Sequence, residues 1–554
     1  MQLNPMHLKV SALLDSRIFR IPEYQRAYSW TKKQRADLFH DIKEAFQSQR
    51  EHFMATVVAL ARETRTIGTD EFRDVELVDG QQRITTIIIL LKAIEKNLKV
   101  DSKIDSKAKR EINELLIKSD EHSLVLLQTN HDSSNIFSNY IRTGETDRKN
   151  SKTIFDNNLI SAADECESFV KSWESKHGLP DLISTLKNKL SLIYHEIADE
   201  ATVYRVFEVL NSRGLDVKWI DKLKSQLMAL IFEHVEDGTR KDAAHEMQVK
   251  WQTIYRVLGQ GANLGDEALR FAGTLLMDIQ PNRIVSEEDA TNQLTQAAGT
   301  DLKNIMAVGK HLENVVQAVQ HLHQNVRIKA VTRISHARFV AVSIILRAFD
   351  KKTTQLLLNS WEKSTFRIFE LGGADTRHKV GEYVRLGYDI INEKLSAEDI
   401  NHNLQYLSSD YSIKSALKNF DHTNCYNGWT EQLRYVLFRY DEHLSKEAGE
   451  RLNTGQWNKI WTQDPSNSIE HILPQSSGSS HTHHLGNLCM LPPNVNSSLK
   501  DIPPQEKAAT YLSCGLKGTA LVGSQLTNQP KWDKKAIEKR SKEILAFIQQ
   551  EWGD

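Results

Sequence analysis

The stretch VDGQQRITT, residues 78–86, joins two apolar segments and decides how the N-terminal part of the chain folds. A strand-like run, FRDVELV, leads into it, and an apolar run, IIILLKAIEKNL, leaves it. The first pattern predicts a β-strand and the second predicts a helix from about Thr85. A turn between two such elements needs one or two polar residues. This junction has an acid, a glycine, two amides and an arginine, so it is equipped to hold a charged group.

A second polar segment, IPEYQRAYSW at residues 21–30, has similar chemistry. Gly80 lets the backbone approach a ligand closely, and the N-terminus of the following helix favours an anion. Arg26 and Arg83 can form forked bonds to phosphate, and Asp79 can hold a magnesium ion. The pattern GxxxxGK[ST] of a P-loop is absent. Two interpretations stay open at this point, a nucleoside triphosphate site and a buried polar network that joins a strand to a helix.

The composition is that of an ordinary soluble globular protein, with 40% hydrophobic and 26% charged residues in 554. This length predicts roughly two to four domains. Glycine (25) and proline (11) are sparse, which favours a mostly helical protein. Lys plus Arg (71) and Asp plus Glu (72) nearly cancel, so the net charge of −1 provides no overall attraction to nucleic acid.

The cysteines and the apolar runs indicate a cytoplasmic protein without a membrane partner. Cys166, Cys425, Cys489 and Cys514 are far apart and form no CxxC pair, which fits a reducing compartment. The first residues lack the apolar core of a signal peptide. Runs such as IIILL are far shorter than the ~20 residues that a membrane span needs.

The C-terminal region contains the parts that a one-metal nuclease needs. Such an enzyme uses a histidine as general base, a residue that fixes this histidine, and oxygen or nitrogen ligands for a divalent metal. The pattern is Glu470-His471, then Gly486-Asn487-Leu488, then Asn494 and Asn496. His471 lies on the strand-like SIEHIL. An alternative is a zinc cluster of His471 with His481, His483 and His484, but the regular His-x3–5-His spacing is missing.

Residues of about 8–235 resemble the N-terminal motor domain of GmrSD-type restriction enzymes. The resemblance rests on IPEYQRAYSW, HFMATVVAL, VDGQQRITT and FEVLNSRG followed by DKLKS, in that order. It implies a ParB/sulfiredoxin-like α/β core that binds and hydrolyses a nucleoside triphosphate, namely GTP, ATP or UTP. It assigns to the nucleotide region Tyr24, Gln25, Arg26, Asp79, Gly80, Gln81, Gln82 and Arg83, with Asn211 nearby.

Residues of about 415–550 resemble the HNH (His-Me finger) nuclease domain of the same enzymes, which has a ββα-metal fold. The resemblance implies that His471 is the general base, Asn487 the orienting residue and Asn496 a ligand of Mg²⁺ or Mn²⁺. Glu470 stands where this fold often has a metal-binding acid, and Asn494 is a further ligand candidate. Lys507 is a candidate phosphate contact. Lys535 and Lys539, on the basic closing helix, contact the DNA backbone or form a solvated face.

Together these features predict an α+β, mostly helical protein with three domains: a nucleotide domain (1–235), a helical relay (236–414) and an HNH nuclease domain (415–554). We expect an NTP-dependent DNA endonuclease or nickase in anti-phage defence that is modification-dependent (type IV) and self-associates as a homo-oligomer. Its partners are the nucleotide and double-stranded DNA, by this reading modified phage DNA. The alternatives are a nucleotide-regulated DNA-binding protein with an inactive HNH domain and a nuclease that cleaves RNA.

Overall fold

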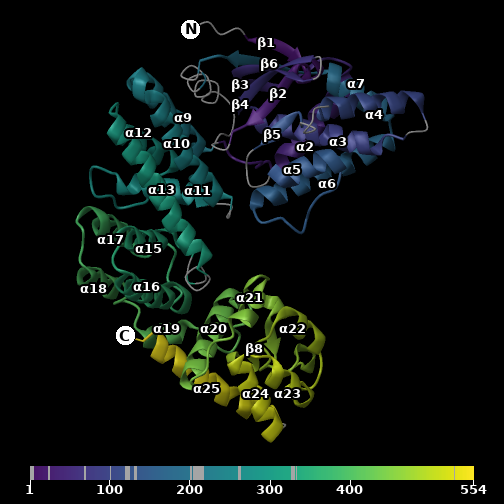
Figure 1. Cartoon of the computed structure of the whole chain (residues 1–554). Helices are drawn as coiled ribbons and strands as arrows, with labels where there is room; N and C mark the ends of the chain where they lie inside the picture. Colours follow the sequence, from purple (N-terminus) through teal and green to yellow (C-terminus); the bar gives the residue numbers. More distant parts are fainter. Residues whose placement is uncertain are drawn as a thin grey trace. The chain divides into compact units, whose positions relative to one another are not determined.

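The computed structural model describes residues 5–22, 25–67, 70–99, 102–118, 125–129, 134–199, 203, 218–259, 264–325, 331, 333–529 and 531–553. The chain forms two compact units (Figure 1). The first comprises Met1–Leu276 and Val285–Gln317, and the second comprises Met277–Ile284 and Ala318–Asp554. The helical region predicted at 236–414 is therefore divided between the two units.

The first unit is built on a mixed six-stranded sheet with the order β1-β6-β3-β4-β2-β5. The strands are β1 (Met6–Lys9), β2 (Arg17–Ile21), β3 (His52–Ile67), β4 (Asp70–Asp79), β5 (Leu127–Thr129) and β6 (Leu190–Ile197). Strands β3 and β4 form an antiparallel hairpin. Strand β2 runs parallel to both β4 and β5, so these three strands end at the same edge of the sheet.

The runs FMATVVALA and FRDVELV predict two strands joined by a hairpin, which are β3 and β4, whereas both strands at the other side of the sheet were missed. The run HLKVSALL predicts one short helix, whereas its first half is β1 and only α1 (Val10–Leu14) is helical. Strand β1 pairs antiparallel with β6, which lies in a stretch predicted to be mostly helical. Pairing of residues that are far apart in sequence decides these strands, and a local pattern does not contain that information.

Helix α3 (Gln81–Asn97) lies at the centre of the first unit and is buried around most of its circumference. It packs against α6 (Ile154–Glu174) and α4 (Lys103–Leu116). The predicted start near Thr85 was wrong by about one turn, because the chain enters the helix directly from Gly80. The Ile84 amide bonds to the Gly80 carbonyl at 3.1 Å, so both glutamines and Arg83 belong to the first turn of α3.

The remaining helices surround this core. The sequence predicts a helix with Thr31 as its N-cap, and helix α2 (Lys32–Ser48) does begin after Thr31. The Gln34 side chain accepts a bond of 2.9 Å from the Thr31 amide. The others are α5 (Ser134–Thr143), α7 (Leu179–Asn188), α9 (Trp219–His234), α10 (Asp237–Leu258), α11 (Leu264–Leu275), α12 (Glu287–Ala298) and α13 (Leu302–Gln324), whose last turns belong to the second unit.

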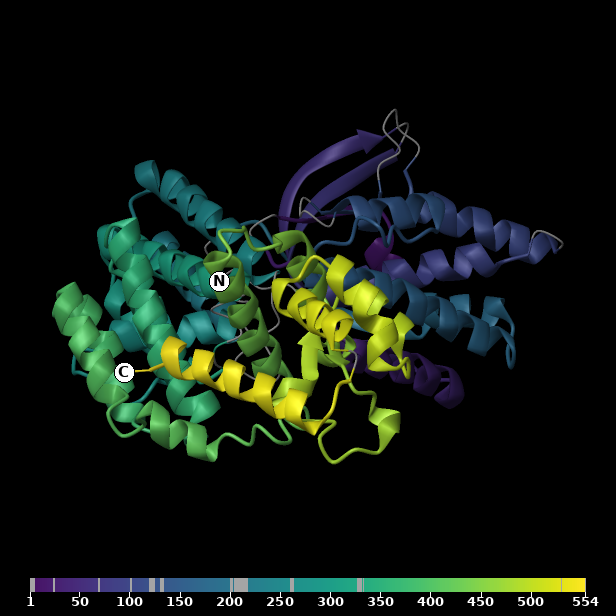
Figure 2. The ribbon, with the colours of Figure 1, turned by 90° about the horizontal axis from the view of Figure 1, so that it is seen from below.

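The second unit is helical apart from one small sheet. Its helices are α15 (Ser335–Leu346), α16 (Lys351–Thr365), the π-helical η1 (Phe366–Leu371), α17 (Val380–Asn392), α18 (Ala397–Leu407), α19 (Ile413–Asn419), α20 (Thr430–Glu447), α21 (Thr454–Trp461), α22 (Pro493–Leu499), α23 (Pro504–Ser513), α24 (Lys517–Asn528) and α25 (Lys534–Glu551). The sheet is an antiparallel pair, β7 (Ile469–His471) and β8 (Leu488–Met490). Helix α25 packs against α20 and the turn before β8 (Figure 2).

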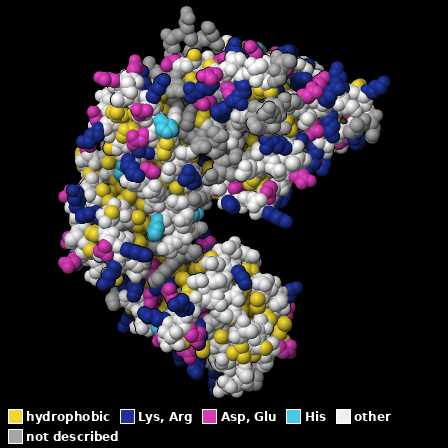
Figure 3. All heavy atoms as spheres, viewed as in Figure 1, with side chains coloured by type: hydrophobic (Ala, Val, Ile, Leu, Met, Phe, Trp, Pro, Cys, Tyr) yellow, Lys and Arg dark blue, Asp and Glu magenta, His cyan; other side chains and the backbone are white. Residues whose placement is uncertain are grey.

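These elements confirm the predicted α+β, mostly helical fold class. In the part of the chain that the structure describes, every helix is too short or too polar to cross a bilayer. Acidic and basic side chains are interspersed over the face shown in Figure 3, in keeping with the net charge of −1.

We predict that Gly80→Ala destabilises the first unit by about 1–3 kcal/mol, the usual cost of a side chain in a sparsely populated backbone conformation. Gly80 has φ +84°, and a Cβ there would lie 2.7 Å from Cγ2 of Val57. Thermal and denaturant unfolding measure the effect. Gly428→Ala is the control, since Gly428 has φ +78° with no atom within 4 Å of a Cβ. Equal losses in the two variants would show that the contact with Val57 contributes nothing.

Candidate functional site

The DGQQR junction and the YQR segment, which are predicted to form one site, do lie together. Both glutamines of the first turn of α3 reach back to the loop of residues 25–30. Nε2 of Gln81 donates to the Arg26 carbonyl at 3.2 Å. Gln82 donates to the Ala27 carbonyl at 3.3 Å and accepts from the Ser29 amide at 2.7 Å. These two side-chain amides therefore fix the loop. Their hydrogen bonds form a polar network of the kind that was one of the two interpretations of the sequence.

Gln25 takes part in the same network, because its side chain donates to the Val78 carbonyl at 3.4 Å. The hydroxyl of Tyr28 bonds to Oγ1 of Thr86 at 2.8 Å. The predicted nucleotide residues Tyr24 and Asn211 lie outside the described residues. The loop is thus anchored to the end of β4 and to α3 from several sides.

Asp79 and Arg83 provide the charges of the junction. Oδ1 of Asp79 accepts a bond of 2.8 Å from the Gly80 amide. Burial raises the pKa of Asp79, while the Gly80 amide, Arg83 and Arg26 act to lower it. The two guanidinium groups therefore compensate the negative charge of the buried Asp79 carboxylate.

Arg83 has a buried donor that no described residue satisfies. Burial lowers the pKa of Arg83, and the nearby carboxylates Asp41 and Asp79 oppose this. Its guanidinium carbon lies 5.5 Å from the ring centre of Trp30, and its Nε is buried without a hydrogen-bond partner among the described residues. An unpaired buried donor on a cation is costly, so this position is suited to an anionic ligand.

The guanidinium group of Arg26 contacts helix α9. Its Nε lies 3.4 Å from Oδ2 of Asp221, in the first turn of α9. Oδ1 of Asp221 accepts a bond of 2.6 Å from the hydroxyl of Tyr255 on α10. Sequence reasoning assigned no role to Asp221 or Tyr255, although DKLKS was among the motifs of the resemblance.

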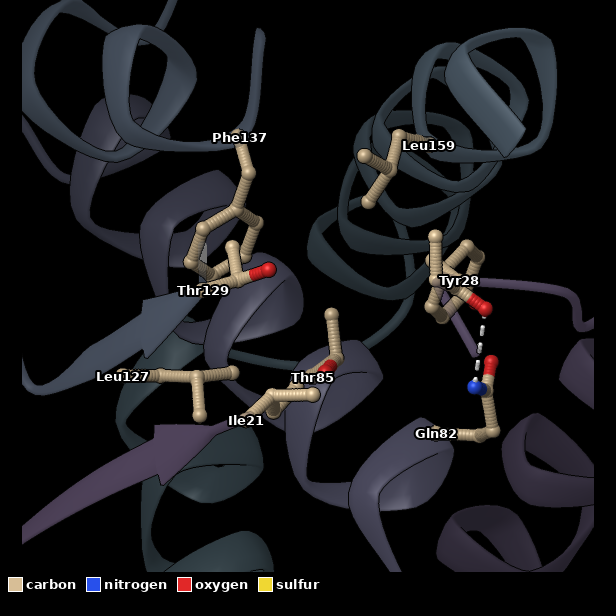
Figure 4. A pocket seen from close by; sticks show the side chains of 9 residues that line it. Ile21, Tyr28, Gln82, Thr85, Leu127, Thr129, Phe137 and Leu159 are labelled. Carbon is tan, nitrogen blue, oxygen red and sulfur yellow. Dashed lines mark hydrogen bonds between the residues drawn. The ribbon is translucent and has the colours of Figure 1, made fainter. Parts of the chain in front are cut away.

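An apolar pocket lies at the same edge of the sheet as the junction (Figure 4). It is lined by Ile21, Ala27, Tyr28, Gln82, Thr85, Leu127, Thr129, Phe137 and Leu159. The Gln82 amide is bonded to the loop, and the Thr85 hydroxyl donates to the Gln81 carbonyl at 2.7 Å. None of these lining residues is charged, so this pocket provides no cation that could pair with an anionic ligand.

In the second unit, the antiparallel pair β7–β8 is followed along the chain by the short helix α22. His471 ends β7 and is paired with Leu488 of β8. Its Nε2 lies 3.2 Å from Nδ1 of His483, and its Nδ1 lies 3.2 Å from the amide nitrogen of Gln475. The ring of Tyr426 stacks on His483 and meets His471 edge-on, with ring centres 5.3 and 4.6 Å away.

The environment of His471 keeps it neutral. Burial, His483 and Lys507 lower its pKa to about 3. The imidazole is therefore unprotonated at neutral pH, which is the form that a general base requires. A bound phosphate would raise this pKa by its negative charge. Gln475 is exposed, so water can replace its amide at Nδ1.

Asn487 is fully buried and all its bonds go to groups other than His471. Its Oδ1 accepts from the Leu473 amide at 2.8 Å and from the indole of Trp532 at 3.0 Å. Its Nδ2 donates to the carbonyls of Leu473 (3.0 Å) and Thr482 (2.8 Å). Asn487 therefore orients His471 indirectly, by fixing the loop that follows β7.

Helix α25 locks the same turn from the other side. Arg540 donates to the carbonyls of Gly486 (2.9 Å) and Leu488 (2.7 Å). The Gly486 amide donates to the Ser541 hydroxyl at 2.9 Å, and a Cβ on Gly486 would lie 2.0 Å from the Ile537 carbonyl oxygen. Lys535 and Lys539 are exposed on this helix, as a DNA contact would require.

Glu470 and Lys507 form a buried ion pair of 2.7 Å. Lys507 is 0% exposed and also donates to the His471 carbonyl at 2.8 Å. The hydroxyl of Tyr511 donates to the same oxygen of Glu470 at 2.8 Å, and burial raises the pKa of Glu470 against both partners. The predicted phosphate contact by Lys507 is therefore wrong for this arrangement, because a fully buried ammonium cannot reach DNA. Its role is to hold the end of β7.

Asn496 presents a fixed side-chain amide oxygen, which is what a metal ligand needs. Its Nδ2 donates to the carbonyls of Asn467 (2.9 Å) and Ile469 (3.3 Å), which fixes the side chain. Its Oδ1 is buried without a partner among the described residues. An amide oxygen of this kind suits a hard cation. Asn494 is exposed.

The alternative of a zinc cluster finds no support in the described part of the chain. No group of three or more His, Cys, Asp or Glu there could hold a metal ion. The rings of His481 and His484 contact each other, 4.6 Å apart, whereas His483 pairs with His471. Tyr426 and Gln475 were missed as neighbours of His471, because neither belongs to a spaced pattern.

Comparison with known families identifies the chain. Residues 10–228 match the N-terminal domain of GmrSD restriction endonucleases, and residues 410–547 match their C-terminal domain. The chain belongs to the GmrSD restriction endonuclease family. It is a restriction nuclease of a defence system, with DNA as its substrate. No curated protein matches the chain.

We predict that Asn487→Ala destabilises the second unit by at least about 3 kcal/mol, since each buried partner left unpaired costs roughly 1–3 kcal/mol. Four such groups, on Leu473, Thr482 and Trp532, lose their partner. Chemical unfolding of the full chain measures the loss. Asn494→Ala, at an exposed position two residues before Asn496, is the matched control and should leave stability unchanged.

Proposed function

We propose that this restriction nuclease depends on a nucleoside triphosphate, which the first unit binds and hydrolyses at the junction of β4 and α3. The observation that supports this most is the buried, unpaired Nε of Arg83 beside Asp79. Arg26, on the loop held by Gln81, supplies a second guanidinium to the same cluster. Phosphate oxygens would satisfy both cations, and GTP, ATP and UTP are the candidate nucleotides.

The second unit, in this proposal, is the HNH domain that cuts or nicks double-stranded DNA. His471 takes a proton from water through Nδ1, the water oxygen attacks phosphorus, and the 3′ or 5′ oxygen leaves. Mg²⁺ or Mn²⁺, when bound, would supply Lewis-acid stabilisation of the charge on phosphate. Oδ1 of Asn496 fits such a cation, whereas Oε1 of Glu470 is taken up by Lys507 and Tyr511.

We further propose that the substrate is modified phage DNA, as in type IV restriction. The intact set of His471, Asn487 and Asn496 and the fixed loop after β7 support an active nuclease over an inactive HNH domain that only binds DNA. A strain expressing the gene, challenged with phages of normal and of modified DNA, tests the biological role.

Purified protein with matched DNA and RNA substrates separates DNA cleavage from the RNA alternative. Light scattering with and without nucleotide tests self-association.

Arg83→Ala should lower kcat/KM of NTP hydrolysis by about 100-fold or more, the usual loss when one donor to a developing charge is removed. The fold should persist, because Arg83 satisfies no buried acceptor in the described structure. Phosphate release with GTP, ATP and UTP is the measurement. Arg110→Ala, on the exposed face of α4, is the control. Unchanged hydrolysis in Arg83→Ala would remove the junction as the nucleotide site.

His471→Ala should lower the rate of DNA cleavage by about 10²–10⁴-fold, the contribution of a general base. Asn496→Ala should also reduce cleavage, and a higher concentration of Mg²⁺ or Mn²⁺ should restore part of it, because only one ligand is lost. Plasmid nicking with modified and unmodified DNA measures both. Asn494→Ala should cleave like the wild type. Full cleavage by His471→Ala would contradict the assignment of this site.

A further inference from the structure

Arg26 is held at two points that belong to different parts of the first unit. Its carbonyl accepts a bond from Gln81 at the start of α3. Its guanidinium is paired through Nε with Asp221, in the first turn of α9. Main chain and side chain are thus fixed by two helices that are distant in sequence.

The way in which Asp221 holds Arg26 leaves the ends of the guanidinium available. A guanidinium has five N–H groups, and the pair with Asp221 involves Nε. No described residue accepts a hydrogen bond from Nη1 or Nη2 of Arg26. The side chain of Arg26 is 22% exposed and that of Asp221 is 12% exposed, so the pair is only partly open to solvent.

Asp221 is itself fixed. The hydroxyl of Tyr255, which is 4% exposed, donates to its other oxygen at 2.6 Å. Nζ of Lys224, one turn further along α9, lies 5.5 Å from the ring centre of Tyr255. Contacts therefore connect Tyr255 on α10 to Asp221 on α9, and Asp221 to Arg26 on the loop. An ion pair that only stabilised the fold would not need this additional support.

We propose that Asp221 and Tyr255 are positioning residues for Arg26, which they orient so that Nη1 and Nη2 bind two oxygens of a nucleotide phosphate. This inference rests on the proposed nucleotide site. A carboxylate that pairs with the Nε side of an arginine can orient the guanidinium group so that its other N–H groups bind phosphate. The pairing also makes α9 sensitive to the position of Arg26, and therefore to whether a phosphate is bound.

The test is NTP hydrolysis and equilibrium nucleotide binding by the full chain in Asp221→Asn, Tyr255→Phe, Arg26→Ala and the double variant Arg26→Ala/Asp221→Asn. Asp221→Asn should raise KM on the order of tenfold, the size found when a partner that orients a ligand-binding group is lost. Tyr255→Phe should have a smaller effect in the same direction. In the Arg26→Ala background, Asp221→Asn should cause no further loss, because it acts only through Arg26.

Glu95→Gln is the matched control, since it breaks another buried ion pair, Lys92–Glu95 of α3, within the same unit. It should leave KM unchanged, and thermal unfolding of every variant separates lost stability from lost binding. Losses that add in the double variant, or an unchanged KM in Asp221→Asn, would overturn the positioning role alone. A wild-type chain that binds no nucleotide would overturn the proposed function and this inference together.

Discussion

Gly80 reverses the chain between β4 and α3 with a backbone conformation that other residues rarely adopt, and Val57 of β3 leaves no space for a side chain there. Because the reversal takes a single residue, the helix begins at Gln81, and the two glutamines are buried in its first turn. From that position their amides reach the loop of residues 25–30. The placement of Arg26 and Arg83 near Asp79 follows from this turn, and a longer turn would move all three apart.

Sequence patterns predicted the elements whose information is local. The hairpin β3–β4, the helix after Thr31 and the strand that contains His471 all follow from periodicity and capping. Strands β1 and β6 did not, because each is stabilised by pairing with a distant partner. The same reason explains the candidate sites. Arg26 and Arg83 were identified as a pair from their motifs, but the role of Asp221 depends on the packing of α9 against that loop.

In the nuclease unit, too, some polar residues from the sequence motifs support the backbone and do not face the substrate. Asn487 was expected to orient the base and Lys507 to contact phosphate. The structure places both, together with Arg540, in buried networks that hold the backbone around β7 and β8. A sequence motif records that such residues are needed, but it does not say whether they touch the substrate or support what does. Burial together with complete hydrogen bonding distinguishes the two cases.

That distinction can be applied to both units by asking which buried polar atoms the protein leaves unpaired. A residue such as Asn487, whose buried polar atoms all form hydrogen bonds within the protein, acts by stabilising the fold. Arg83 Nε and Asn496 Oδ1 are buried and unpaired in the described structure, one a cationic donor and the other a neutral acceptor. Binding of a ligand of opposite character is one way to offset the cost of leaving such an atom unpaired. The donor calls for an anion such as phosphate, and the acceptor calls for a cation such as Mg²⁺. In the proposed function, a nucleotide phosphate would meet the donor of Arg83 in the first unit, and a divalent cation would meet the acceptor of Asn496 in the second.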